Sequence, residues 1–296
     1  MFGQSIIYRY LCVQNKDAEM KKTITILSQG LLIAYFLFFS FSVLAKAEEQ
    51  REYASRKYKL VFQDEFNQRN GSLPDSTKWR FRERANNICA RWNSRSGKVA
   101  FIKNGKLCCR AIPNVSEQSD TAKMLTGSID TKGRFSIRYG KIEVRLRTRV
   151  KEGNFPAAWM RPVDDGHPYT YAEFDIFETF GKDGLARQTV HSHRSEVLKK
   201  DCPKHSFSTK VDLSKWHVYA VEWDRDQVVF SIDGVITGKY PRLAHQDGED
   251  EGQWSFDRNF FIILDQSVGK KGWHEPDTHA VYETQFDWVR VYKRIR

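Results

Sequence analysis

The sequence predicts an all-β sandwich of about 240 residues, spanning residues 58–292. Short runs alternate apolar and polar residues with a period of two, and turn-forming pairs separate these runs. The sequence has no long amphipathic helix pattern and no internal repeat. Aromatic residues make up 14% of the chain and supply bulky side chains for a core between two sheets. This composition excludes disorder, a collagen-like chain and a protein with several membrane spans.

Six runs carry the strand prediction, and each is bounded by turn signals. The turn pairs at 104–105, 132–133, 165–166, 183–184 and 233–234 all end in glycine, which is typical of tight turns. The pairs at 226–227 and 233–234 frame a predicted hairpin. The predicted strands are 58–62, 140–148, 218–223, 228–232, 260–264 and 286–292.

Residues 1–47 have the three-part pattern of a secretory signal peptide. Two lysines precede an apolar run at 31–44, a small-x-small cleavage site ends at Ala47, and Met20 is a candidate true start. The apolar run is shorter than the about 20 residues that a membrane span needs. We therefore expect residues 48–296 to form one secreted domain, periplasmic or extracellular, with no stable membrane span once the signal is removed.

The chain is basic, with 48 Lys and Arg against 37 Asp and Glu, a formal net charge of +11. Removing the five basic and two acidic residues of the leader leaves +8. This balance points to an anionic partner. Nucleic acid is not expected, because no basic recognition helix, zinc finger or RNP-type aromatic strand is present. We expect a monomer that binds an anionic polymer.

Four cysteines follow the leader, and export would allow a disulfide among them. Adjacent Cys108 and Cys109 in a strand would point to opposite faces, so at most one of them could meet Cys89. The spacing does not resemble a zinc site. The fourth cysteine is Cys202.

The most informative stretch is 171–181, where three acids stand among bulky apolar residues. Glu173 and Asp175 share a face because side chains alternate along a strand. Glu178 would fall on the opposite face of a regular strand, and a one-residue bulge between 175 and 178 would return it to the first face. Two strand steps cover about 6.6 Å, so we expect the two glutamates to lie at roughly the working distance of a catalytic carboxyl pair once the bulge shortens the strand.

Like charges so close raise at least one pKa, which favours one neutral acid and one ionised nucleophile at the same pH. Glycoside hydrolysis with retention uses such a carboxyl pair about 5–5.5 Å apart. The spacing alone leaves open a solvated strand face or a calcium cage.

The segment 173–178 (EFDIFE) resembles the E-x-D-x-x-E signature of glycoside hydrolase family 16. Segments 59–66, 126–145, 154–160 and 286–292 also resemble family segments in the same order, so the resemblance covers nearly the whole chain after the leader. It implies a concanavalin-like β-jelly roll of two antiparallel sheets, with a concave glycan cleft across one sheet.

The resemblance also implies a double-displacement mechanism. Glu173 would be the nucleophile, Glu178 the general acid/base, and Asp175 would orient the nucleophile. One departure is Ala172, where the family often has glycine. The stretch before it lacks the Trp-Pro of many glucanase members, which weakens a glucanase assignment.

Sugar faces stack on aromatic rings, and polar groups beside the rings read the hydroxyls. The resemblance places Trp159 one strand from the acids, Trp92 in a loop over the non-reducing side of the cleft, and His193 pointing into the cleft. His191 and His193 could share a strand face as metal ligands, but no third ligand is evident. The full expected substrate-binding set is Trp92, Trp159, Arg91, His193, Arg194, Arg161, Trp254 and Trp273.

Arginines cluster around the first cleft loop, and arginine binds sulfate or carboxylate with a planar fork. Arg194 stands where related glucanases carry tryptophan. We therefore expect a secreted, endo-acting, retaining β-glycosidase that hydrolyses a red-algal β-galactan, sulfated porphyran first, like the β-porphyranase and agarase-like members. The clustered arginines are Arg80, Arg82, Arg84, Arg91 and Arg95.

Two other functions stay open. One is a laminarinase-like β-1,3- or mixed-linkage β-1,3-1,4-glucanase, and the other is a non-catalytic glycan-binding jelly roll. Catalysis needs no cofactor on this interpretation. The resemblance implies a structural calcium ion on the convex side, at Glu65, Gly105 and Asp287.

Overall fold

The computed structural model describes residues 43–115, 121–169, 171–244 and 251–295. The chain divides into two units, residues 1–56 and 57–296. In the first unit residues 43–55 are helical, and most of the expected signal peptide lies outside the described residues. None of the helices within the described ranges is long and apolar enough to cross a membrane.

The second unit is built almost entirely from antiparallel strands, as predicted, and every predicted run forms one. The single short helix, among the described residues of this unit, is α2 (His193–Glu196). The strands are β1 (Tyr58–Asp64), β2 (Arg80–Phe81), β3 (Ala100–Ile102), β4 (Leu107–Pro113), β5 (Met124–Asp130), β6 (Gly140–Thr148), β7 (Asn154–Pro162), β8 (Ala172–Glu178), β9 (Leu185–Ser192), β10 (Ser206–Lys210), β11 (His217–Trp223), β12 (Gln227–Ile232), β13 (Val235–Pro241), β14 (Phe260–Val268) and β15 (Tyr282–Arg294).

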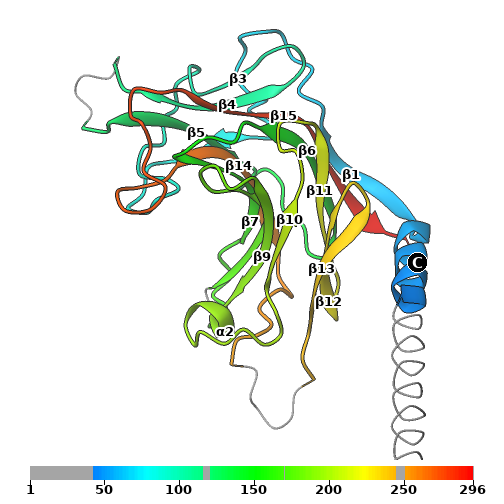
Figure 1. Ribbon diagram of the computed structural model, residues 1–296. Coiled ribbons are helices and arrows are strands. Elements are labelled where there is room, and N and C mark those ends of the chain that lie inside the picture. The colour runs from blue at the N-terminus through cyan, green and yellow to red at the C-terminus, as the bar shows by residue number, and fades with distance from the viewer. Residues whose placement is uncertain (1–42, 116–120, 170, 245–250, 296) are drawn as a thin grey trace, which may run out of the picture. The chain divides into compact units, whose positions relative to one another are not determined.

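The strands form two layers. The inner layer runs β10-β9-β8-β7-β14-β5, and the outer layer runs β4-β15-β6-β11-β12-β13, with a short β4–β5 pairing that joins them. Figure 1 shows β7, β9 and β14 curving beside β6, β11 and β15. This is the two-sheet, curved jelly-roll architecture that the resemblance implied.

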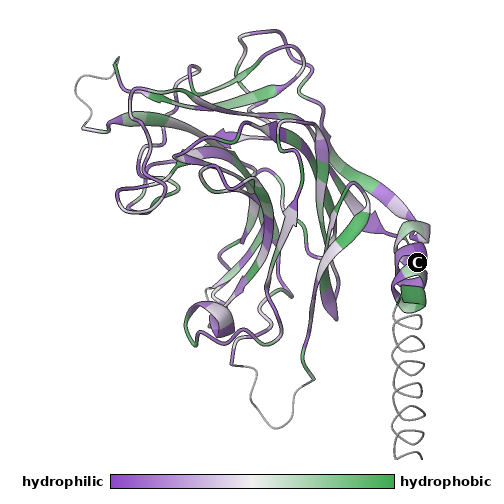
Figure 2. Cartoon of the chain, in the orientation of Figure 1, coloured by the Kyte–Doolittle hydropathy of each residue, from purple (hydrophilic) through white to green (hydrophobic). Residues whose placement is uncertain are grey.

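A large aromatic core fills the space between the layers. Phe174 of β8 packs against Phe260 of β14, with ring centroids 4.7 Å apart, and against Trp223 of β11 at 5.3 Å. All three side chains are almost fully buried. Because each buried aromatic contributes several kcal/mol through area removed from water, this core fixes which face of each inner strand points outward. Figure 2 shows the resulting alternation of hydrophobic and hydrophilic residues along the strands.

The four cysteines that follow the leader are free thiols. Cys108 and Cys109 are consecutive residues of β4 and both are buried, while Cys89 lies apart from them beside β14, its carbonyl accepting from Ser267 Oγ at 2.9 Å. The disulfide that export would allow is therefore not formed in this structure.

Candidate active site

A bulge in β8 brings the three acids to one face, as the spacing predicted. Asp175 pairs with Thr189 of β9 and Glu178 pairs with Arg187, so three steps on β8 oppose two on β9. The consecutive residues Ile176 and Phe177 both point into the core and are fully buried. Burial of two adjacent apolar side chains is what reverses the alternation and turns Glu178 outward.

The backbone separation of the two glutamates differs from the expected two strand steps. Glu173 pairs with His191 and Glu178 with Arg187, four residues along β9, which corresponds to about 13 Å of strand. The expected spacing was wrong because Asp175 occupies the intermediate position on the same face. The glutamate side chains are long enough to lean toward each other above this shorter aspartate.

The three acids line one cavity of about 420 Å³ on the outward face of the inner layer. Its walls are largely apolar and aromatic, and its volume is in the range of a small-molecule or sugar site. The other residues that line it are Ile88, Cys89, Phe155, Ala157, Trp159, Phe180, His191, Lys270 and Trp273.

Burial sets the protonation of the two glutamates. Burial and the neighbouring Asp175 charge raise the pKa of Glu173 to about 7, although His191 and Arg161 oppose this rise. The same two causes, burial first, raise the pKa of Glu178 well above its usual range. At neutral pH Glu178 is thus a proton donor, while Glu173 lies near its midpoint with two cations that favour its ionised form.

His191 is the side chain that holds Asp175, and it was not among the expected substrate contacts. Its Nε2 lies 2.8 Å from Asp175 Oδ2 and its Nδ1 lies 2.6 Å from Glu196 Oε1. Burial lowers the pKa of His191, but Asp175 and Glu196 outweigh this and raise it to about 12. The ring is therefore an imidazolium that donates to both carboxylates.

Expected residue His193 lies elsewhere. The strand ends at Ser192, so His193 begins α2. Its ring packs at a tilt against Tyr169, with ring centroids 4.9 Å apart, instead of sharing the face of His191. It does not line the cavity. The pairing of Glu173 with His191 across β8 and β9 was the signal that could have identified the correct histidine, and it requires the strand register.

Glu173, Asp175 and His191 offer three possible metal-ligand atoms that all lie within 4.8 Å of one another. His191 therefore has two acids as neighbours, where the sequence analysis found no further ligand for it. The hydrogen bond between His191 and Asp175 accounts for this clustering through the protein's own groups.

Arg161 lies where the sequence analysis expected a substrate contact, and it also contacts a catalytic candidate. Its Nη1 donates to Glu173 Oε2 at 3.0 Å, and the side chain is 42% exposed. Arg161 follows Trp159 on the same face of β7. The guanidinium therefore lies beside Glu173 and still has donors that face solvent.

Two of the four tryptophans expected as sugar platforms line the cavity. Trp159 forms part of the wall, with its Nε1 donating to Asp265 Oδ2 at 2.9 Å and the Arg82 guanidinium 4.8 Å from its ring. Trp273 lies at the other end, with its ring edge-on to Phe155 and Phe180 at 5.3 and 5.1 Å.

The other two tryptophans lie outside the cavity. Trp254 is 3% exposed and packs in the core against Phe256, so its assignment as a sugar platform was wrong. Trp92 is partly buried against a small cluster around Met124, and Arg91 covers its ring at 4.0 Å. Arg91 itself donates to the carbonyl of Gly269 at 2.5 Å.

Most of the arginines around the first cleft loop bond within the protein. Arg80 makes a two-point ion pair with Asp130, Arg84 donates to the carbonyl of Asn93, and Arg95 pairs with Glu83. Arg194 also has internal partners, Glu251 Oε2 at 2.5 Å and the carbonyl of Cys202 at 3.0 Å. The sequence pattern could not distinguish these bonded guanidinium groups from free ones.

The three residues expected to hold calcium do not fit a cation. Glu65 accepts both Nε and Nη2 of Arg290, at 2.8 and 3.0 Å. Asp287 accepts from Arg145 and from Lys106 Nζ, the latter at 2.6 Å. Since basic side chains already neutralise both carboxylates, Gly105 has no acidic partner with which to form a cage.

The cavity therefore combines a protonated carboxylic acid, a second carboxyl beside two cations, and aromatic walls. This set can protonate a leaving group and supply a nucleophile on either side of one bond. The positioning of both acids on one strand, with Asp175 and His191 between them, suits chemistry on an extended polymer lying across the strands.

Residues 94–256 match the sequence profile of Glycosyl hydrolases family 16. The chain is 29% identical over 246 residues to a keratan-sulfate endo-1,4-beta-galactosidase from Sphingobacterium multivorum, which covers 81% of this chain and 56% of that protein. It is 27% identical to glucan endo-1,3-beta-glucosidase A1 from Niallia circulans, covering 79% of this chain and 38% of that protein. The chain thus spans about half or less of the length of these two relatives.

Solved structures share the fold. The laminarinase from Rhodothermus marinus superposes with a TM-score of 0.70 at 26% identity, over 82% of this chain and all of that chain. A structure from work on endo-acting O-glycanases that initiate mucin breakdown, expressed by members of the human gut microbiota, gives a TM-score of 0.68 at 26% identity, over 80% of this chain and all of that chain.

Proposed function

The chain belongs to glycosyl hydrolase family 16, and from that premise we propose that it is a retaining endo-β-galactosidase acting on a sulfated galactan. Membership of the family supports an endo-acting β-glycoside hydrolase. The observation that carries the catalytic part of the proposal is the pair of outward-facing glutamates on β8, both with raised pKa values, in one aromatic-walled cavity.

In the proposed mechanism Glu178 gives its proton to the glycosidic oxygen while the Glu173 carboxylate attacks the anomeric carbon. The bond to the leaving sugar breaks, and a covalent glycosyl ester forms on Glu173. Glu178, now ionised, takes a proton from water, which attacks the same carbon and releases Glu173. The expected product keeps the β configuration.

Asp175 and His191 position the nucleophile in this mechanism. The Asp175 carboxylate is bonded by the His191 imidazolium, which is itself held by Glu196. This chain of bonds keeps a negative charge beside Glu173 without leaving it uncompensated, because the imidazolium supplies the balancing charge. Arg161 adds a second cation on the other side of Glu173.

Support for a sulfated galactan comes from three sources. The exposed Lys270 lines the cavity, and the half-exposed Arg161 contacts Glu173 of its lining, so both offer donors for an anionic group. The chain after the leader carries a net +8. The relative from Sphingobacterium multivorum is by name a galactosidase acting on keratan sulfate, which is the reason to keep a galactan over a glucan. Porphyran is the sulfated galactan we would test first.

A β-1,3- or mixed-linkage glucanase is the second candidate. The likeness to the Rhodothermus marinus laminarinase favours it, since that structure covers most of this chain at 26% identity. In both cases the chain is proposed to act outside the cytoplasm, after removal of the signal peptide that the sequence predicts.

A substrate panel with the residues 48–296 protein tests the proposal. The protein is incubated with porphyran, keratan sulfate, neutral agarose, laminarin and barley β-glucan, and new reducing ends are measured. We expect the fastest release from a sulfated galactan, and a β-anomer as the first product by ¹H NMR. Faster release from laminarin or barley glucan would replace the galactan by the glucan assignment.

The non-catalytic alternative is tested in the same assay. The Glu173→Gln variant keeps the shape of the cavity and removes the nucleophile. Release of reducing ends by this variant at the parental rate would show that the acids on β8 do not carry the reaction.

A further inference from the structure

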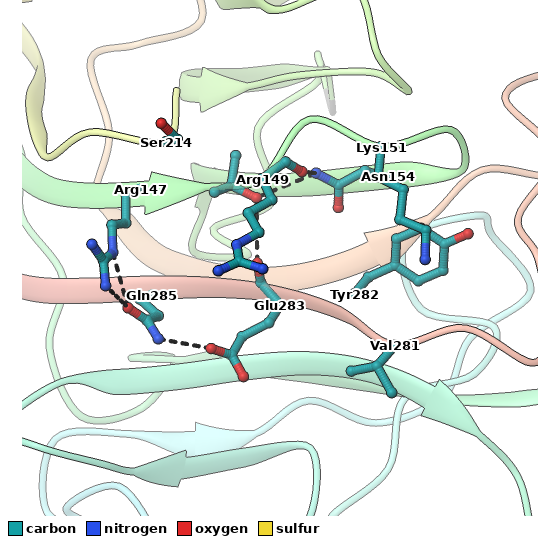
Figure 3. A pocket seen from close by; sticks show the side chains of 10 residues that line it. Arg147, Arg149, Lys151, Asn154, Ser214, Val281, Tyr282, Glu283 and Gln285 are labelled. Atoms are coloured by element: carbon teal, nitrogen blue, oxygen red, sulfur yellow. Dashed lines mark hydrogen bonds between the residues drawn. The ribbon is translucent and has the colours of Figure 1, made fainter. Parts of the chain in front are cut away.

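A second cavity, of about 590 Å³, lies over the start of β15 and the end of β6 and shares no lining residue with the catalytic cavity. Three cationic side chains, Arg147, Arg149 and Lys151, line it from β6 and the turn that follows (Figure 3). One acid, Glu283, lines it from β15. Its volume is large enough for a sugar ring with a charged substituent.

The charges of this cavity are not balanced internally. Glu283 accepts from Arg110 Nε at 2.6 Å, so its charge is already compensated by a residue that is not part of the lining. Arg147 contacts a neutral group, with its Nε and Nη2 both donating to Gln285 Oε1 at 3.0 and 2.9 Å. Figure 3 shows this chain of bonds from Arg147 through Gln285 to Glu283.

Arg149 and Lys151 have no carboxylate partner within the described part of the chain. Lys151 Nζ lies 4.9 Å from the ring centre of Tyr282, which orients the ammonium without neutralising it. By contrast, Arg145 and Lys106 contact Asp287, and Arg290 contacts Glu65. The lining of this cavity therefore carries a local excess of positive charge.

Hydroxyl and amide groups complete the lining beside these cations. The Asn154 side chain donates to Thr148 Oγ1 at 3.2 Å and to the carbonyl of Arg149 at 2.9 Å, which fixes the turn that carries the two unpaired cations. Ser214 lies at the edge. Such a mixture of fixed polar groups and cations can bind an anionic sugar but offers no acid/base pair for chemistry.

The two cavities adjoin the same short segment of β7. Asn154 lines the basic cavity and the next residue, Phe155, lines the aromatic end of the catalytic cavity. The turn is tied to the end of β8, because the Lys151 amide donates to the carbonyl of Gly181 at 3.2 Å. A polymer that leaves the catalytic cavity past Phe180 and Trp273 would approach this turn.

We propose that the cavity lined by Arg147, Arg149 and Lys151 is a non-catalytic site that binds a sulfate-bearing sugar of the same polysaccharide. The choice of a sulfated galactan as its ligand rests on the proposed function, whereas its selectivity for an anionic over a neutral chain rests on the lining alone. A planar guanidinium and an ammonium in one cavity supply donors for the three oxygens of a sulfate ester.

The test uses binding without hydrolysis. In the inactive Glu173→Gln background, the Arg149→Ala/Lys151→Ala variant is compared with Arg69→Ala/Lys98→Ala, which removes the same charge from exposed positions elsewhere. Affinity for porphyran, neutral agarose and duplex DNA is measured by affinity electrophoresis at several salt concentrations. We expect the cavity variant to lose about threefold to tenfold in porphyran affinity, with the control variant unchanged.

Three results would overturn the proposal: unchanged porphyran affinity in the cavity variant, an equal loss in the control variant, or DNA binding as tight as porphyran binding and lost in the same variant. Hydrolysis is assayed separately in the active protein, which keeps Glu173, with a short neutral oligosaccharide as the substrate. The substitutions of Arg149 and Lys151 should leave kcat/KM for this substrate unchanged. A glucan preference in the substrate panel would refute the galactosidase proposal. The binding measurement would still decide whether this cavity prefers an anionic over a neutral chain.

Discussion

The two cavity glutamates of the inner layer and Asp287 of the outer layer have pKa values shifted in opposite directions. In the catalytic cavity burial and the Asp175 charge raise the pKa of Glu173 and Glu178. On the outer layer burial also acts on Asp287, but hydrogen bonds from Lys106 and Arg145 outweigh it and lower the pKa. Glu65 on the same layer has a two-point ion pair with Arg290.

The difference is one of partners. Asp287 has two basic side chains at hydrogen-bond distance, Lys106 and Arg145, which stabilise its ionised form. Glu173 and Glu178 lie beside a third acid, Asp175. The His191 imidazolium forms its hydrogen bonds with Asp175 and Glu196. An acid that keeps its proton at neutral pH can donate that proton in catalysis, whereas an acid held by its own basic partner cannot.

The largest effect is expected from Glu178→Gln and Glu173→Gln. Each should lower kcat by at least about 10³-fold, because one removes the proton donor and the other removes the nucleophile. Azide should restore partial activity to the Glu173 variant with an activated substrate and invert the product configuration. Loss of less than tenfold in either variant would remove that glutamate from the mechanism.

The same substitutions should stabilise the fold at alkaline pH. The folded-state pKa of Glu173, about 7, lies above its unfolded value, so its contribution to stability is present at acidic pH and is lost as pH rises through about 7. In Glu173→Gln this loss is absent, and the variant should exceed the parent at pH 8 by on the order of 2 kcal/mol in unfolding free energy. Urea unfolding at pH 5 and pH 8 measures the difference.

Two histidine–aspartate pairs give the next comparison. His191→Ala leaves the almost fully buried Asp175 without its cation, and we expect a loss of about 3 kcal/mol in unfolding free energy together with a fall in kcat. His217→Ala breaks the pair with the half-exposed Asp233 of the outer layer, at 2.7 Å, and should cost under about 1 kcal/mol with no change in kcat. Similar losses of unfolding free energy in the two variants would contradict the idea that burial makes the His191–Asp175 pair the more important one.

Arg161→Ala should move the acidic limb of the pH–activity profile to higher pH. The Arg161 guanidinium lowers the pKa of Glu173, so its removal raises that pKa and delays ionisation of the nucleophile. Arg161→Lys should restore most of the shift, since the charge returns. Arg290→Ala, which breaks the ion pair with Glu65, is the matched control, and its pH profile should coincide with the parent's.

The smallest effect is expected from calcium. Because Glu65 and Asp287 already have basic partners, 5 mM calcium or a chelator should change Tm by less than about 1 °C. A rise of several degrees with calcium would show that these side chains rearrange around the ion.

Local sequence patterns predicted the strand pattern and the bulge. Ile176 and Phe177 are adjacent apolar residues in an otherwise alternating strand, and that break in period is visible without any tertiary information. His191 was misjudged in favour of His193 because the end of β9 and its register with β8 depend on contacts distant in sequence. The arginines of the first loop illustrate the same limit, since a guanidinium is free or bonded according to residues up to 178 positions away.

Because Ile176 and Phe177 are both buried, the number of residues between Asp175 and Glu178 determines which face of β8 carries Glu178. One residue inserted between Phe177 and Glu178, with the bulge retained, would direct the proton donor into the hydrocarbon interior, while the remaining surface could still hold a glycan. A hydrolase of this build therefore stands one in-frame insertion from a carbohydrate-recognition protein.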